Sequence, residues 1–96
     1  MPQIVWTDNA IDDMNRHYDF IKVNNVEAAS RALEAILSSG ESLQQNPRRG
    51  AIVNEKAGLR KLLVPFGKYG FVIHYIVLED DVVILNVYHG RENRPR

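Results

Sequence analysis

The side chains of this 96-residue chain that could bind a ligand or take part in a reaction lie mainly in its second half. The stretch from residue 59 to residue 91 is dominated by Val, Ile, Leu, Phe and Tyr, and its polar exceptions include Arg60, His74, Asn86, His89 and Arg91. If folding brings Arg60 and Arg91 together with Lys61 and Arg94, the cations would bind phosphate or carboxylate groups. The alternative is that these arginines only keep a sheet surface soluble.

Aromatic side chains also favour a binding function, whereas the sequence contains no motif for a metal site or a catalytic nucleophile. Tyrosine rings near the cations could stack on nucleic-acid bases; they are Tyr69, Tyr75 and Tyr88. The three histidines, His17, His74 and His89, are not paired with a second histidine or cysteine at helical spacing. No phosphate loop, nucleophile elbow or dinucleotide fingerprint is present. We therefore expect no metal site and no cofactor.

Three apolar runs, at residues 59–66, 71–78 and 82–89, are separated by short polar or Gly-bearing breaks, which is typical of an antiparallel meander. The segment 67–70 supplies the first turn. If Asp80 and Asp81 form a two-residue second turn, His74 faces Val87 and Val72 faces His89. A three-residue turn would move the last strand's side chains to the other face, so the sequence leaves open whether His74 and His89 are neighbours. Val83 and Leu85 are expected in the core.

The first half of the chain predicts a short strand followed by two helices. Residues 4–6 form an apolar run, and Thr7 or Asp8 can cap the helix that follows. Apolar residues then recur at spacings of three and four, first at Ile11, Met14, Tyr18 and Ile21, and again at Ala29, Leu33, Ile36, Gly40 and Leu43. Asn24 and Asn25 separate the two stripes, and Pro47 predicts that the second helix ends near residue 46. Gly40 lies on the apolar face, where a missing side chain allows a neighbour to approach closely.

The length predicts one domain over residues 1–96, and a helical hairpin lying on one face of the sheet is the natural way to bury both apolar stripes. The chain has no cysteine, which fits a reducing cytoplasm, and no apolar run reaches the roughly 20 residues that span a bilayer.

The zero net charge hides a difference in charge between the two halves of the chain. Residues 1–46 carry three basic and seven acidic side chains, whereas residues 47–96 carry nine basic and five acidic ones. An acidic half followed by a basic half favours an anionic partner for the sheet.

The order of these motifs resembles the RelE/ParE toxin superfamily. The resemblance rests on a short strand, a helical hairpin ending in N-P, and then L-R-K-L-L-V, G-F-V-I-H-Y, a D-D turn and V-V-I-L-N-V-Y-H-G-R-E. It covers nearly the whole chain and implies an α+β fold, with an N-terminal helical hairpin packed on a twisted antiparallel sheet. It implies a small bacterial toxin of a type II toxin-antitoxin, or plasmid-stabilisation, module. It also implies a hetero-oligomeric complex with a cognate antitoxin that is ParD-like or similar, with no membrane involved.

The superfamily has two main activities, and the resemblance implies one or the other for this chain. The RelE branch cuts messenger RNA on the ribosome with a cluster of basic residues and a C-terminal acid/base residue. Arg60 and Arg91 align with two of its basic positions, whereas Leu62 and Val72 stand where it has further cations. His89 could shuttle a proton at neutral pH, which leaves a nuclease site of Arg60, His89 and Arg91 as the alternative.

The resemblance is better to the ParE branch, which inhibits DNA gyrase by binding and has similar V-x-H-G-R endings. On this hypothesis the chain is a gyrase inhibitor and not an enzyme, and its target-binding residues are Arg60, His74, His89, Arg91 and Arg94. A non-toxic interaction module with the same fold is the third possibility.

Overall fold

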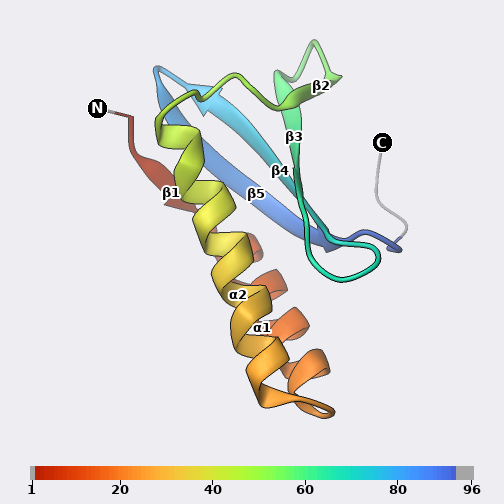
Figure 1. Cartoon of the computed structure of the whole chain (residues 1–96). Coiled ribbons are helices and arrows are strands. Elements are labelled where there is room, and N and C mark those ends of the chain that lie inside the picture. Colours follow the sequence, from red (N-terminus) through yellow and green to blue (C-terminus); the bar gives the residue numbers. More distant parts are fainter. Residues whose placement is uncertain (1, 93–96) are drawn as a thin grey trace.

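A computed structural model describes residues 2–92 and shows two helices packed on one face of a five-stranded sheet (Figure 1). Within these residues, no helix is both long enough and apolar enough to span a bilayer. The elements in chain order are β1 (Ile4–Trp6), α1 (Asp8–Lys22), α2 (Val26–Glu41), a short 3₁₀ helix (Ser42–Gln44), β2 (Ala51–Asn54), β3 (Leu59–Val64), β4 (Phe71–Leu78) and β5 (Asp81–His89).

The strand order is β1-β5-β4-β3-β2. Strands β2 to β5 form the antiparallel meander, with β2 added at one edge, whereas β1 pairs with β5 in parallel at the other edge. The predicted α+β class with a helical hairpin on a sheet is therefore confirmed. The sheet itself is mixed, because the chain leaves β1 through α1 and returns to the same edge only at β5.

The first helix begins after one of the two capping residues that the sequence suggests, and the second begins directly after the break at Asn24 and Asn25. The Thr7 side chain accepts from the Ala10 amide and caps α1, and the Asn25 side chain accepts from the Ala28 amide and caps α2. The second helix ends at Glu41, earlier than Pro47 predicts, because the chain tightens into the 3₁₀ turn. Gly40 lies against Trp6, where an added Cβ would collide with the indole ring. The close approach expected at Gly40 is confirmed.

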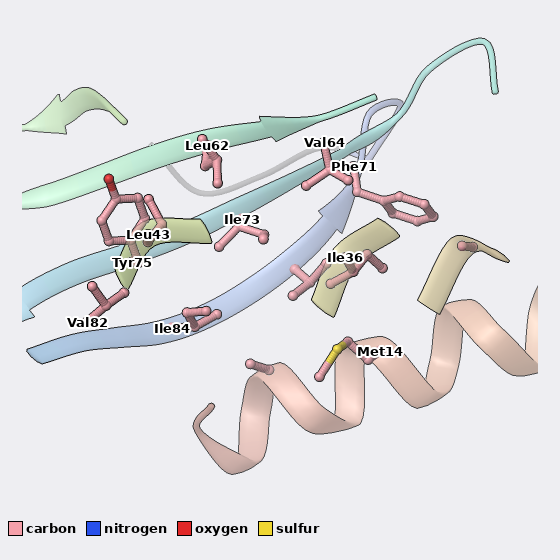
Figure 2. Close-up of a cluster of buried hydrophobic side chains, with 13 residues drawn as sticks. Met14, Ile36, Leu43, Leu62, Val64, Phe71, Ile73, Tyr75, Val82 and Ile84 are labelled. Carbon is pink, nitrogen blue, oxygen red and sulfur yellow. The ribbon is translucent and has the colours of Figure 1, made fainter. Parts of the chain in front are cut away.

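The core lies between the helices and one face of the sheet (Figure 2). Alternate residues of β3, among them Leu62 and Val64, point toward the helices, while Leu63 is 66% exposed on the opposite face. Fully buried side chains from the other elements complete the core; the largest are Ile36, Leu43, Ile73, Tyr75, Val82, Ile84 and Val87.

Next to its turn, the last hairpin differs from both registers considered from the sequence, whereas from His74 onward its pairing is the one that a three-residue turn would give. Its turn residues are Glu79 and Asp80, both with positive φ, and Leu78 pairs with Asp81. Positive φ at both central positions is the geometry of a two-residue hairpin turn that matches strand twist. The predicted Asp80–Asp81 turn is therefore wrong by one residue.

A β-bulge then shifts the pairing a second time. Tyr75 pairs with Ile84 but His74 pairs with Asn86, so Leu85 is an extra residue on β5. Val82 and Ile84 face the helices before the bulge, and Val87 faces them after it. The expectation that Val83 and Leu85 belong to the core is wrong, since both are only partly buried and lie outside the core cluster.

Candidate functional site

Arg60 and Arg91 lie at different ends of the sheet. Arg60 pairs with Tyr75 near β2, and its guanidinium donates to the carbonyl oxygens of Arg48, at 2.9 Å, and Gly50, at 2.8 Å. Arg91 follows the far end of β5, where His89 pairs with Phe71. Tyr75 and Phe71 are four positions apart along β4, so the two levels are separated by about 13 Å at the usual rise of a strand. The predicted cluster of both arginines does not form, because Arg60 binds the loop that leads into β2.

His74 and His89 lie on opposite faces of the sheet. His74 is 5% exposed on the face away from the helices, where its ring centroid is 5.1 Å from that of Tyr88. The bulge at Leu85 turns His89 toward the helices instead, against Phe71. His74 therefore offers little surface to a partner. Arg94, the remaining predicted binding residue, lies outside the described residues.

His89 and Arg91 do come together, with Tyr69 between them. The Arg91 guanidinium carbon lies 4.9 Å from the centroid of the Tyr69 ring, and the His89 ring lies 5.8 Å from the same ring. The backbone N–H of Arg91 donates to His89 Nδ1 at 3.2 Å, so the proton of the neutral imidazole is on Nε2. Lys68 Nζ is 5.5 Å from the Tyr69 ring centroid. Two cations thus stack on one exposed aromatic ring.

This cluster borders a pocket of about 640 Å³ between α1 and the far end of the sheet. We refer to it as the α1–β5 pocket; its wall includes Phe20, Ile21, Phe66, Tyr69, Phe71 and His89. Phe71 is buried in the wall, whereas Phe20 is 79% exposed at the rim. A concave aromatic surface with a few charged groups at its edge is the usual form of a binding site.

The edge of β5 beside this pocket is closed by two side chains of α1. β1 pairs only with Val82, Val83 and Ile84, so the later β5 backbone has no neighbouring strand on that side. There the Val87 N–H donates to Asp13 Oδ2 at 2.9 Å, and His17 Nε2 donates to the Val87 carbonyl at 2.8 Å. Asp13 and His17, one helical turn apart, therefore satisfy the strand edge as a partner strand would.

Electrostatic contacts join the same face of α1 to the end of β5. Arg16 lies 3.5 Å from Asp13 and 3.3 Å from Glu92, whose Oε1 also accepts from the His89 N–H at 2.8 Å. Burial lowers the pKa of His17, and its hydrogen bond to the Val87 carbonyl opposes that shift only in part. Desolvation alone would raise the pKa of Glu92, but the His89 amide and the Arg16 charge outweigh it and lower that pKa. At neutral pH the helix face thus carries a neutral His17 beside an ionised Glu92.

Acidification is expected to destabilise the fold through His17. Because its pKa is lowered in the folded state, the unfolded chain takes up a proton first as the pH falls below about 6.5. The stability that neutral His17 contributes is complete above that pH and is lost below it. Urea unfolding between pH 7.5 and 5.5 measures this loss. His17→Gln, which keeps a donor for Val87, should show a smaller dependence on pH, and an unchanged dependence would remove His17 as its source.

The sequence interpretation missed the role of Asp13 and His17, and it left Phe20 and Lys68 out of the site. The spacing of four residues between Asp13 and His17, on the face that also holds Ala10 and Met14, was the available signal. It could not have identified Val87 as the partner. That contact exists because β1 is short and because β5 carries a bulge.

The chain matches the family described as the ParE toxin of the type II toxin-antitoxin system parDE, over residues 4–94. Three toxins of Caulobacter vibrioides are similar in sequence. RelE3 is 40% identical over 70% of this chain and 71% of its own length, RelE1 30% over 85% and 86%, and RelE2 33% over 94% and 97%.

Two solved structures share the fold. One chain, from a chromosomal ParDE toxin-antitoxin system of P. aeruginosa, superposes with a TM-score of 0.76 at 26% identity, covering 93% of this chain and 96% of that one. A chain from the toxin-antitoxin complex RelBE2 of Mycobacterium tuberculosis gives 0.65 at 23% identity, covering 93% and 99%. This chain therefore belongs to the ParE toxin family, within the RelE/ParE superfamily of type II toxins.

Proposed function

We propose that this chain is a toxin that a cognate antitoxin neutralises and that inhibits DNA gyrase by binding, without covalent chemistry. The proposal implies action in the bacterial cytoplasm and needs no cofactor. Family membership supports the antitoxin, and the two solved relatives come from toxin-antitoxin systems. The choice of gyrase follows from the ParE family match together with the arrangement of cations.

The choice of gyrase as the target rests on the separation of Arg60 from Arg91 in the structure. Cleavage of a phosphodiester without a metal needs several positive groups around one phosphate. Here the Arg60 guanidinium donates to backbone carbonyls at one end of the sheet, while Arg91 lies at the other. Leu62 and Val72, where the RelE branch has further cations, are buried on opposite faces. Lys68, His89 and Arg91 remain together around Tyr69, and this small group suits recognition of an acidic surface better than phosphoryl transfer.

Ribosome-dependent cleavage of messenger RNA is the second candidate. It is favoured by the RelE names of the three Caulobacter relatives and by the positions of His89 and Arg91, whose side chains lie against the same Tyr69 ring. In that case Arg60 would have to leave its carbonyl partners to join the site. An interaction module that is not toxic would share the fold and show neither activity.

Induced expression with two separate readouts tests the proposal. We expect growth arrest, loss of negative supercoiling in a reporter plasmid and intact transcripts. The purified protein should inhibit gyrase supercoiling at micromolar concentration. Transcripts cut on the ribosome while plasmid topology stays normal would transfer the function to the RelE branch. Unaffected growth at full expression would indicate the non-toxic module.

A further inference from the structure

We infer that Glu92 is a positioning residue for target binding: its carboxylate closes the turn 89–92 into the shape that presents Arg91 on the Tyr69 ring. The inference rests on the proposed function, because that function assigns target binding to Arg91. Glu92 acts through Arg91 and does not itself contact the target. Three sets of contacts support this role: those within the turn, those between the turn and residues 67–70, and those between Glu92 and α1.

The turn 89–92 is held closed by two hydrogen bonds between Glu92 and His89. The Glu92 carboxylate accepts from the His89 N–H at 2.8 Å, and the Glu92 N–H donates to the His89 carbonyl at 2.9 Å. A bond to an ionised carboxylate is roughly twice as strong as one between neutral groups. A further bond inside the turn runs from the Arg91 N–H to His89 Nδ1. The N–H groups of Arg91 and Glu92 are therefore both bonded, which fixes the direction in which the Arg91 side chain leaves the turn.

Gly90 sets how closely this turn lies against the hairpin that carries Tyr69. Its N–H donates to the Gly70 carbonyl at 2.9 Å. A Cβ at Gly90 would collide with the Tyr69 carbonyl oxygen, so only glycine allows the two backbones to approach this closely. Arg91, the next residue, then reaches the Tyr69 ring, with its guanidinium carbon 4.9 Å from the centroid. Gly90 brings the turn to Tyr69, and Glu92 keeps the turn in shape there.

Glu92 also joins the turn to α1. Arg16 Nη2 lies 3.3 Å from Glu92 Oε2, and His17 Nε2 lies 3.7 Å from Glu92 Oε1. Both carboxylate oxygens are thus engaged within the protein, Oε1 by the His89 N–H and Oε2 by Arg16. A surface that Arg91 and Lys68 attract is acidic, and a second carboxylate repels it. Glu92 therefore favours binding by holding Arg91 and not by touching the target.

Holding Arg91 in place matters because an arginine side chain has many rotamers when it is free. Fixing them on binding weakens the affinity, and a side chain that is already fixed in the unbound protein avoids this loss. Stacked on Tyr69 and leaving a closed turn, Arg91 is fixed in this way. Without the Glu92 carboxylate the turn opens, and the Arg91 side chain regains its freedom before binding.

A gyrase supercoiling assay of the full chain tests the inference. Glu92→Ala should raise the half-inhibitory concentration about three- to tenfold. Glu92→Gln keeps an oxygen for the His89 N–H and should stay within about twofold of the unchanged protein. In a chain that already carries Arg91→Ala, Glu92→Ala should have no further effect, because both changes act on one contact. Glu55→Ala, in the exposed turn between β2 and β3, controls for the loss of one carboxylate and should inhibit normally.

Nuclear magnetic resonance of the same variants follows Arg91 directly. Protons held over an aromatic ring resonate upfield, and Tyr69→Leu gives the shifts of the Arg91 side chain without the ring. Glu92→Ala should move the Arg91 side-chain resonances toward those values, whereas Glu92→Gln should leave them near those of the unchanged protein. Melting temperatures verify that each variant folds.

The outcomes separate this inference from the function on which it rests. If the unchanged chain leaves gyrase active, the proposed function is wrong, whereas the Arg91 shifts still confirm or overturn its placement by Glu92. Normal inhibition by Glu92→Ala, or Arg91 resonances that do not move, would overturn the inference alone. An equal loss from Glu92→Ala with and without Arg91 would also overturn it, since Glu92 would then act independently of Arg91.

Discussion

Replacing Ile84 with alanine is expected to lower the free energy of unfolding by about 3–5 kcal/mol, because the side chain is fully buried and the surrounding elements cannot collapse into the space. It faces the helices from the central part of β5, as Figure 2 shows. A domain of this size is stable by only roughly 5–15 kcal/mol, so the loss is a large fraction of the total. Urea unfolding measures it directly, and the melting temperature should fall by more than about 12 °C.

Ile76→Ala is the matched control, since it removes the same atoms from the neighbouring strand. Ile76 pairs with Val83 on the face away from the helices and is only partly buried. Its truncation should cost about 1 kcal/mol. If the two variants lose equal stability, the core does not lie on the face to which the structure assigns it.

The different positions of Ile84 and Ile76 also show how far the sequence determines the fold. Hydrophobic spacing locates both helices, and Thr7 is one of the two residues that the sequence offers as the cap of the first. The side chains of β5 that reach the core depend on a turn at Glu79–Asp80 and on one extra residue, Leu85. A single inserted residue reverses the alternation that follows it. Nothing in the run V-V-I-L-N-V marks that residue, because every position in it suits a strand.

The candidate site was less predictable than the fold for a related reason. Residue type identified His89 and Arg91, and both lie in one cluster with Tyr69. Residue type could not show that Arg60 lies apart from this cluster. The partners of Arg60 are the backbone carbonyls of Arg48 and Gly50, and every residue has a backbone carbonyl, so the sequence does not indicate which ones it binds. The parallel pairing of β1 was equally hidden, yet it decides where the β5 edge is left to Asp13 and His17.

Arg91→Ala is expected to reduce inhibition of the target by about 30-fold while leaving the melting temperature unchanged. An arginine that anchors an interface contributes about 2 kcal/mol, and every 1.4 kcal/mol changes affinity tenfold. Arg91 is exposed, and its side chain contacts only Tyr69 among the described residues, so the fold does not depend on it. The measurement is the half-inhibitory concentration in the supercoiling assay, with growth after induction at equal protein level as the cellular readout.

Arg60→Ala should show the opposite pattern, which makes the two arginines a test of the site itself. Its guanidinium holds two carbonyls of the loop before β2, so its loss should cost about 1–3 kcal/mol of stability and should leave inhibition by the remaining folded protein near normal. Lys56→Ala, in the exposed turn between β2 and β3, controls for the loss of one positive charge. If Arg60→Ala abolishes inhibition at an unchanged melting temperature while Arg91→Ala inhibits normally, the target binds at the β2 end of the sheet. The dispersal of cations would then no longer argue against the nuclease, because Arg60 would be free to act on a substrate.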